Sequence, residues 1–83
     1  MNVSQYSFLG YSSRIIKLNK EASGRLLGVK LGRLCIKHDV PVTYVADNLG
    51  VSRQTVYNWF TGATNPHDEA TSSVQKLVKQ LSS

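Results

Sequence analysis

The chain has 83 residues and a hydrophobic fraction of 41%, which fits one small globular domain and excludes a disordered chain. Its formal net charge is +5, and residues 1–40 carry all of that excess, with seven Lys or Arg against two acidic residues. Such a basic half indicates a polyanionic partner, unless the charge serves only as a solvated face.

The single cysteine excludes an intrachain disulfide, and its apolar surroundings predict that Cys35 is a buried core residue. Together with His38 and His67 it has no metal-ligand spacing, so we expect no metal and no cofactor. No apolar run is long enough to span a membrane, and residues 1–18 lack the pattern of a signal peptide. These features predict a cytoplasmic protein without a membrane partner.

Residues 1–18 are the least regular part of the sequence. Aromatic and β-branched residues are frequent from residue 5 onward, among them Tyr6, Phe8, Tyr11, Ile15 and Ile16. Such residues favour extended structure, with Gly10 in a turn, although a flexible arm is an equal alternative. We therefore expect an extended or flexible segment over residues 1–18, outside a helical domain of residues 19–83.

Residues 20–38 are predicted to form one helix with Asn19 as its N-cap. Helical spacing relates four apolar residues, Leu27, Leu31, Leu34 and Cys35, and also His38. Gly28 and Gly32 lie four residues apart, on one side, where another backbone can approach closely. A different face carries three cations, Lys30, Arg33 and Lys37.

Two short helices with a corner between them follow. Pro41 begins the first, and Gly50 ends it with the left-handed backbone that a tight exit requires. Ser52 caps the second, which covers residues 53–60. Their apolar residues are Val42, Val45, Ala46 and Leu49 in the first helix and Val56, Trp59 and Phe60 in the second.

A last helix is predicted to begin with Asn65 as its cap and Pro66 in its first turn. Its inward residues are Ala70, Val74, Leu77, Val78 and Leu81. The predicted fold is therefore all-α, a small bundle of four to five helices, with a short extended segment at the N-terminus as one option.

The corner between the two short helices has the positional requirements of a helix-turn-helix unit. Ala46 is small, so that the second helix can cross close to the first, and Gly50 makes the corner. Val51 fills the angle between the helices, while Val56 and Trp59 seat the second helix on the core.

The stretch 42–62, with its A-x-x-x-G-V-S core and the V-x-x-W pair that follows, resembles the motif of the Cro and lambda-repressor-like (XRE-type) family. The likeness extends loosely over residues 20–81 and does not cover residues 1–18. It implies that residues 52–60 form a recognition helix whose N-terminal half enters the major groove of double-stranded DNA. The predicted structure is then a helix-turn-helix DNA-binding domain.

The resemblance assigns base contacts to four residues, Arg53, Gln54, Tyr57 and Asn58. Their chemistry agrees, because Arg can grip guanine with two hydrogen bonds and Gln or Asn can grip adenine in the same way. Contacts to the DNA backbone are expected from Ser52, Thr55, Thr61, Thr64, Asn65 and Lys37. On any one exposed helical residue a merely solvated side chain is a common alternative.

The loop after the recognition helix departs from the family pattern, because its sequence TGATN carries no charge. Cations from elsewhere are then needed to hold the phosphates. The available candidates are Lys30, Arg33, Lys37, Arg14, Lys17 and Lys20.

These features predict a sequence-specific transcriptional regulator, a Cro-like repressor of the phage type, that binds a palindromic operator as a homodimer. We expect no small-molecule effector, and a place in the cytoplasm or nucleoid of a bacterial host cell. An enzyme is not expected, since paired carboxylates, an activated nucleophile and a phosphate loop are all missing from the sequence. Alternatives are a protein-interaction module of the same fold and an accessory DNA-architectural protein of recombination or packaging.

The dimer contact is expected to involve the N-terminal segment. Val29, Ile36 and the two glycines lie on a side of their helix that the helix-turn-helix does not obviously cover. The competing interpretation is a basic arm, in which Arg14 and Lys17 reach the DNA.

Overall fold

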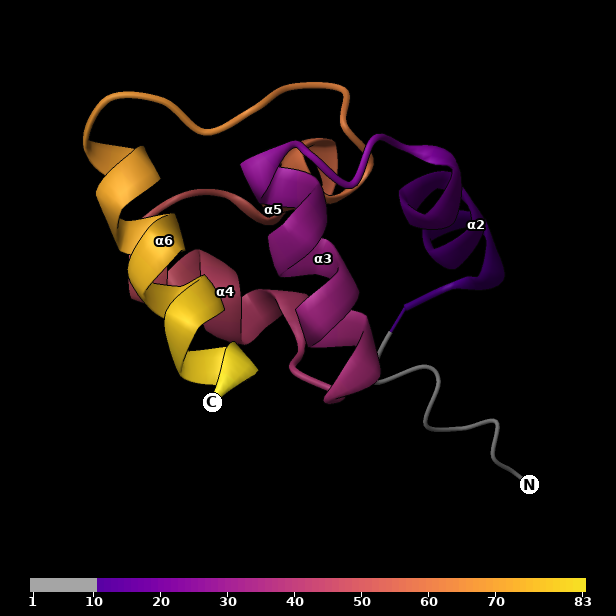
Figure 1. Ribbon diagram of the computed structural model, residues 1–83, viewed down its shortest axis with the longest axis horizontal. Coiled ribbons are helices and arrows are strands. Elements are labelled where there is room, and N and C mark those ends of the chain that lie inside the picture. The colour runs from indigo at the N-terminus through magenta and orange to yellow at the C-terminus, as the bar shows by residue number, and fades with distance from the viewer. Residues whose placement is uncertain (1–10) are drawn as a thin grey trace.

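Five α-helices make up the part of the chain that the structure, a computed structural model, describes, which is residues 11–83 (Figure 1). They are α2 (Ser13–Glu21), α3 (Leu27–Lys37), α4 (Val42–Leu49), α5 (Arg53–Phe60) and α6 (Glu69–Ser82). The central helix α3 packs against α2, α5 and α6, and α4 packs against α5 and α6. The prediction of a small all-helical bundle is confirmed, and residues 11–83 contain no strand.

The extended structure considered for the N-terminal segment is wrong for residues 13–18, which belong to α2. The Ser12 hydroxyl accepts a hydrogen bond from the backbone N–H of Ile15 at 3.2 Å, and so caps the first turn. The turn expected at Gly10, like Tyr6 and Phe8, lies outside the described residues.

The single helix expected over residues 20–38 is also wrong, because the chain leaves the helical conformation between α2 and α3. Ser23 and Gly24 lie in this break, and both are poor residues for a helix interior. The Ser23 hydroxyl accepts from the N–H of Arg25 at 3.3 Å, a local bond that competes with helix formation.

Arg33 closes the C-terminal end of α2 from the neighbouring helix. Its guanidinium group donates to the carbonyl oxygens of Asn19, Lys20 and Ala22 at 3.3, 3.3 and 2.9 Å. Asn19 and Lys20 belong to the end of α2 and Ala22 is its C-cap, a region where backbone carbonyls lack the regular helical partners. Arg33 therefore has a structural role at the end of α2, and the phosphate contact considered for it stays a prediction.

Asn19 was expected to cap a helix that follows it, and this is wrong. It lies inside α2 with only 3% of its surface exposed. Its side-chain amide donates to the carbonyl oxygen of Phe60 at 2.7 Å and to that of Val29 at 3.3 Å. One buried side chain thus connects α2 to the end of α5 and to α3.

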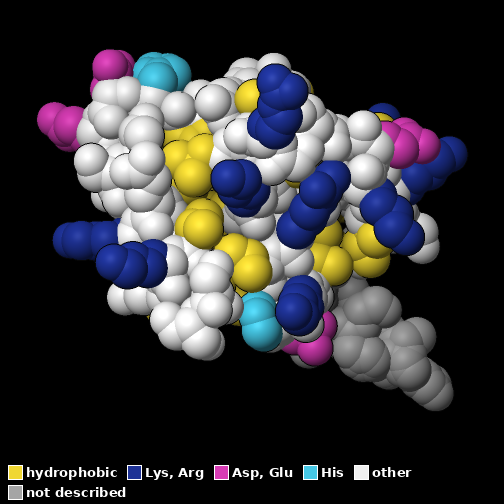
Figure 2. Space-filling model, in the orientation of Figure 1, with side chains coloured by type: hydrophobic (Ala, Val, Ile, Leu, Met, Phe, Trp, Pro, Cys, Tyr) yellow, Lys and Arg dark blue, Asp and Glu magenta, His cyan; other side chains and the backbone are white. Residues whose placement is uncertain are grey.

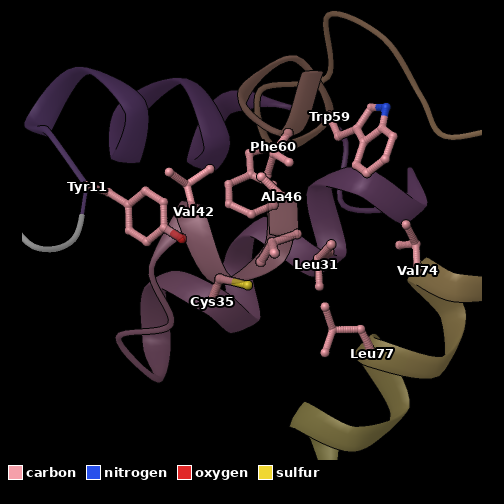
Figure 3. Close-up of a cluster of buried hydrophobic side chains, with 11 residues drawn as sticks. Tyr11, Leu31, Cys35, Val42, Ala46, Trp59, Phe60, Val74 and Leu77 are labelled. Atoms are coloured by element: carbon pink, nitrogen blue, oxygen red, sulfur yellow. The ribbon is translucent and has the colours of Figure 1, made fainter. Parts of the chain in front are cut away.

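The core is centred on Phe60, which is fully buried beneath α3 (Figure 3). The Tyr11 ring packs on it, with 5.8 Å between ring centroids and an interplanar angle of 53°. The Tyr11 hydroxyl donates to the carbonyl oxygen of Val40, and burial raises the pKa of this hydroxyl, which keeps it protonated. Cys35 is buried as predicted, and burial raises the pKa of its thiol to about 12.

The two glycines of α3 allow α5 to approach closely, as their spacing predicted. A methyl group at Gly28 would lie 2.7 Å from Cβ and 2.8 Å from the carbonyl oxygen of Trp59. A methyl group at Gly32 would lie 2.8 Å from Cγ of Phe60. Val29, Gly28 and Gly32 are covered by the chain itself, so these three are not available for a dimer contact, whereas Ile36 is half-buried and lines a groove. The dimer role expected for the N-terminal segment stays a prediction.

The helix-turn-helix corner has the predicted local structure. Gly50 ends α4 with φ 68° and ψ 34°, and the N–H of Val51 bonds the carbonyl oxygen of Ala46 at 3.1 Å. The Ser52 hydroxyl accepts from the N–H of Thr55 at 3.1 Å and begins α5.

The predicted start of the last helix is wrong, because α6 begins at Glu69 and Asn65 does not cap it. The side-chain oxygen of Asn65 instead accepts from the backbone N–H of Gly28, in the first turn of α3, at 3.3 Å. None of the helices between residues 11 and 83 is long and apolar enough to cross a membrane.

Replacing Gly32 with Ala should destabilise the fold by about 1–3 kcal/mol, because the added methyl group overpacks the contact with Phe60. At an exposed helical position the same change would stabilise by up to about 1 kcal/mol, so the sign of the effect is diagnostic. Urea-induced unfolding measures it, with Lys30→Ala on the solvent side of α3 as the control. A stabilised Gly32→Ala variant would contradict the close approach of α5.

Replacing Asn19 with Ala should cost about 1–3 kcal/mol, because the carbonyl oxygen of Phe60 is left without its buried donor. Thermal unfolding of this variant can be compared with that of Asn48→Ala, which changes an exposed asparagine of α4. A loss no greater than that of the control would show that the Asn19 amide contributes little.

Candidate nucleic-acid interface

Helix α5 has one buried side and one accessible side. Val56, Trp59 and Phe60 point into the core. At 100° per residue the opposite side is centred on Gln54 and Asn58. The accessible surface therefore carries amide side chains at its middle.

The four residues expected to contact bases differ in exposure. Arg53 and Gln54 are exposed, whereas Tyr57 and Asn58 are half-buried. Tyr57 also packs against the hydrophobic core, so part of its ring has a structural role. Arg53 lies in the first turn of α5, at the exposed N-terminal end of the helix.

Gln54 and Asn58 are joined by a hydrogen bond in which the Gln54 amide donates to the Asn58 side-chain oxygen at 3.0 Å. One amide proton and the side-chain oxygen of Gln54 remain free, because the NH₂ group has two protons. Gln54 thus keeps the donor and the acceptor that adenine requires, while Asn58 restricts its rotation.

Two grooves flank α5 along its length. The first, of about 340 Å³, separates it from α2 and is lined by Ser12, Arg14, Ile15, Leu18, Gln54, Tyr57, Asn58 and Thr61. The second, of about 400 Å³, separates it from the loop before α6, and Thr55, Asn58, Trp59 and Asn65 are among its lining residues. Asn58 lines both grooves, so it stands on the ridge between them.

Arg14 lies at this surface, in the groove that Gln54 and Asn58 also line. It was one of several cations considered for phosphate contacts, and nothing in the sequence distinguished it from the rest. Residues 14 and 54 are far apart in the chain, and only the packing of α2 beside α5 brings them together.

Ser52 and Thr55, both expected to contact the DNA backbone, are bonded to each other. Their hydroxyl oxygens are 2.9 Å apart, and Ser52 also accepts from the Thr55 N–H. Since one hydroxyl donates to the other, the pair retains one free hydroxyl proton.

Three further backbone candidates lie in the loop after α5. The Thr61 hydroxyl donates to the carbonyl oxygen of Tyr57 at 3.0 Å, so its proton is already engaged. Asn65 uses its side-chain oxygen on α3 and keeps both amide protons. Thr64 is exposed. The donors that this loop can offer to a phosphate are therefore at Thr64 and Asn65.

Lys37, the remaining backbone candidate, lies on a different side of the molecule. It shares the solvent side of α3 with Lys30 and Arg33, opposite the glycines that contact α5. In the view of Figure 2 a row of Lys and Arg side chains covers α3, which lies in front of α5. The structure thus does not bring Lys37 together with the other candidates.

No cluster of three or more His, Cys, Asp or Glu that could hold a metal ion occurs between residues 11 and 83. His67 and Asp68 contact each other at 2.9 Å, but both side chains are highly exposed. Comparisons of the chain with protein-family models, curated proteins and solved structures found no match.

Proposed function

We propose that this protein is a sequence-specific DNA-binding regulator that reads base edges in the major groove with α5. The observation that carries the proposal is the Gln54–Asn58 pair beside Arg53, on the accessible side of a helix that a glycine corner and a serine cap hold in place. Arg suits guanine, and a Gln with a free donor and acceptor suits adenine.

The groove between α2 and α5 supports the same assignment. Helices in contact lie about 8–10 Å apart, and the major groove is about 12 Å wide. With α5 in the groove, a neighbouring helix lies over the bordering phosphate strand. Arg14 on α2 can then supply the cation that the uncharged loop after α5 lacks.

We further propose that the protein acts as a homodimer on a near-palindromic operator, as a repressor of the Cro-like phage type in the cytoplasm or nucleoid of a bacterial cell. The eight residues of α5 span about 12 Å, or roughly four base pairs, which is too few for a unique site. Two copies reading half-sites about 34 Å apart would provide the specificity.

Selection of bound sequences from a random duplex library tests the proposal most directly. We expect an enriched motif with two inverted half-sites about one helical turn apart. Enrichment of a single half-site would support base reading by α5 but contradict the homodimer. No enrichment at low salt would overturn the proposed function.

Replacing Arg53 or Gln54 with Ala should weaken binding to the selected site and relax the preference at one base pair by roughly 1–3 kcal/mol. Both side chains are exposed, so the unfolding midpoint should stay close to that of the unmodified protein. Competition between matched and single-mismatch duplexes measures the preference. Arg25→Ala and Gln75→Ala change the same residue types at other exposed positions and should leave it intact.

Replacing Arg14 with Ala should weaken binding to all duplexes alike and lower the salt dependence by about one phosphate contact. Lys30→Ala removes the same charge from the opposite side of the molecule and should have a smaller effect. Affinities measured over a range of salt concentrations separate the two variants. If both variants showed the same dependence of affinity on salt concentration, the placement of α2 over the DNA backbone would be contradicted.

A further inference from the structure

A third groove, of about 250 Å³, lies between α2 and α3, away from the accessible side of α5. It is lined by Ile16, Asn19, Lys20, Arg33, Ile36 and Lys37. Ile16 and Lys20 line it from one side of α2, whereas Arg14 and Leu18, on a different side of α2, line the groove beside α5. A duplex bound along α5 beside Arg14 is therefore separated from this groove by α2.

The floor of this groove is apolar. Ile16 is 38% exposed, although the solvent side of a short helix ordinarily carries polar residues, and Ile36 beside it is half-buried. A closed cavity of about 150 Å³ holds a benzene ring, so this groove has room for about one aromatic or two aliphatic side chains.

Cations surround the apolar floor. Lys20 and Lys37 are exposed on its two walls, and Arg33 is held at its edge by the carbonyl oxygens at the end of α2. Among the described residues no carboxylate forms an ion pair with any of the three. Figure 2 shows hydrophobic surface between Lys and Arg side chains where α2 meets α3.

We propose that this groove binds an acidic amphipathic segment of another protein. One or two of its apolar side chains seat on Ile16 and Ile36, and its carboxylates pair with Lys20 and Lys37. The phosphates of a second DNA duplex can pair with the lysines, but a duplex offers no apolar side chain to pack on Ile16 and Ile36. A second copy of this chain brings the same excess of positive charge toward it.

The proposal does not depend on DNA binding. If α5 reads DNA, the two surfaces face different directions and can be occupied together, so that the protein connects a DNA site to a protein partner. The basic charge of residues 1–40 then has a function that contacts along α5 do not account for.

A synthetic helical peptide tests this groove. It has roughly four turns, with Leu along one side and Glu along the other, and a scrambled peptide of the same composition is its control. Titration followed by NMR at physiological salt should shift the amide signals of residues 16, 20, 33, 36 and 37. The scrambled peptide should bind at least about tenfold more weakly, since it cannot present both sides at once.

Ile16→Ser should weaken the peptide about tenfold, the loss expected for removing one apolar anchor. Leu18→Ser is the matched control, because Leu18 is equally exposed, at 37%, but lines the groove beside α5. Lys37→Gln should also weaken the peptide, whereas Lys76→Gln on α6 should not.

Three results would overturn the proposal: no saturable binding of the amphipathic peptide, equal binding of the scrambled peptide, or equal losses for Ile16→Ser and Leu18→Ser. A fourth result would also overturn the proposal: a DNA duplex of random sequence displaces the peptide from the unmodified protein and shifts the signals of the same five residues. The groove would then be a phosphate-binding surface. The unfolding midpoints of the variants establish that each is folded.

Discussion

The buried amide of Asn19 is the interaction on which the arrangement of the helices depends. A buried amide is costly unless it is hydrogen-bonded, and this one bonds the carbonyl oxygens of Phe60 and Val29. These two bonds join the end of α5 and the carbonyl of Val29 in α3 to one side chain of α2. Gly32 completes the arrangement, because a methyl group there would lie 2.7 Å from the Asn19 nitrogen.

Two other contacts extend this connection into a ring, in which three helix ends are each satisfied by a side chain from another part of the chain. Asn19 of α2 serves the end of α5, Asn65 after α5 serves the start of α3, and Arg33 of α3 serves the end of α2. The side of α5 that carries Gln54 and Asn58 is therefore positioned in part by Asn19 and Arg33, which have no part in the candidate interface. In a domain with so small a core, such bonds hold the geometry that side-chain packing alone would leave loose.

Sequence reasoning succeeded where the cause is local. Gly50, Ser52 and the apolar residues Val56 and Trp59 act within a few positions of one another, and the corner and α5 were predicted from them. It failed for Asn19 and Asn65, which do satisfy helix ends, but of helices 41 and 37 residues away in the chain. The same limit applies to the candidate site, because Gln54 and Asn58 share one helix whereas Arg14 reaches them only through tertiary packing. Ser12, a residue type that often caps helices, could have predicted the start of α2 from the sequence, but the prediction was not made.

The ring of helix ends has a consequence for how the chain folds as it is synthesised. Residue 19 leaves the ribosome well before its main acceptor at residue 60, and at about 5–20 residues per second the interval is roughly 2–8 s. During that time the Asn19 amide lacks its acceptor on Phe60. The end of α2 also lacks the Arg33 guanidinium until residue 33 has been synthesised. The nascent N-terminal half therefore lacks its buried partners until α5 emerges, and α6, which adds Val74 and Leu77 to the core, arrives last.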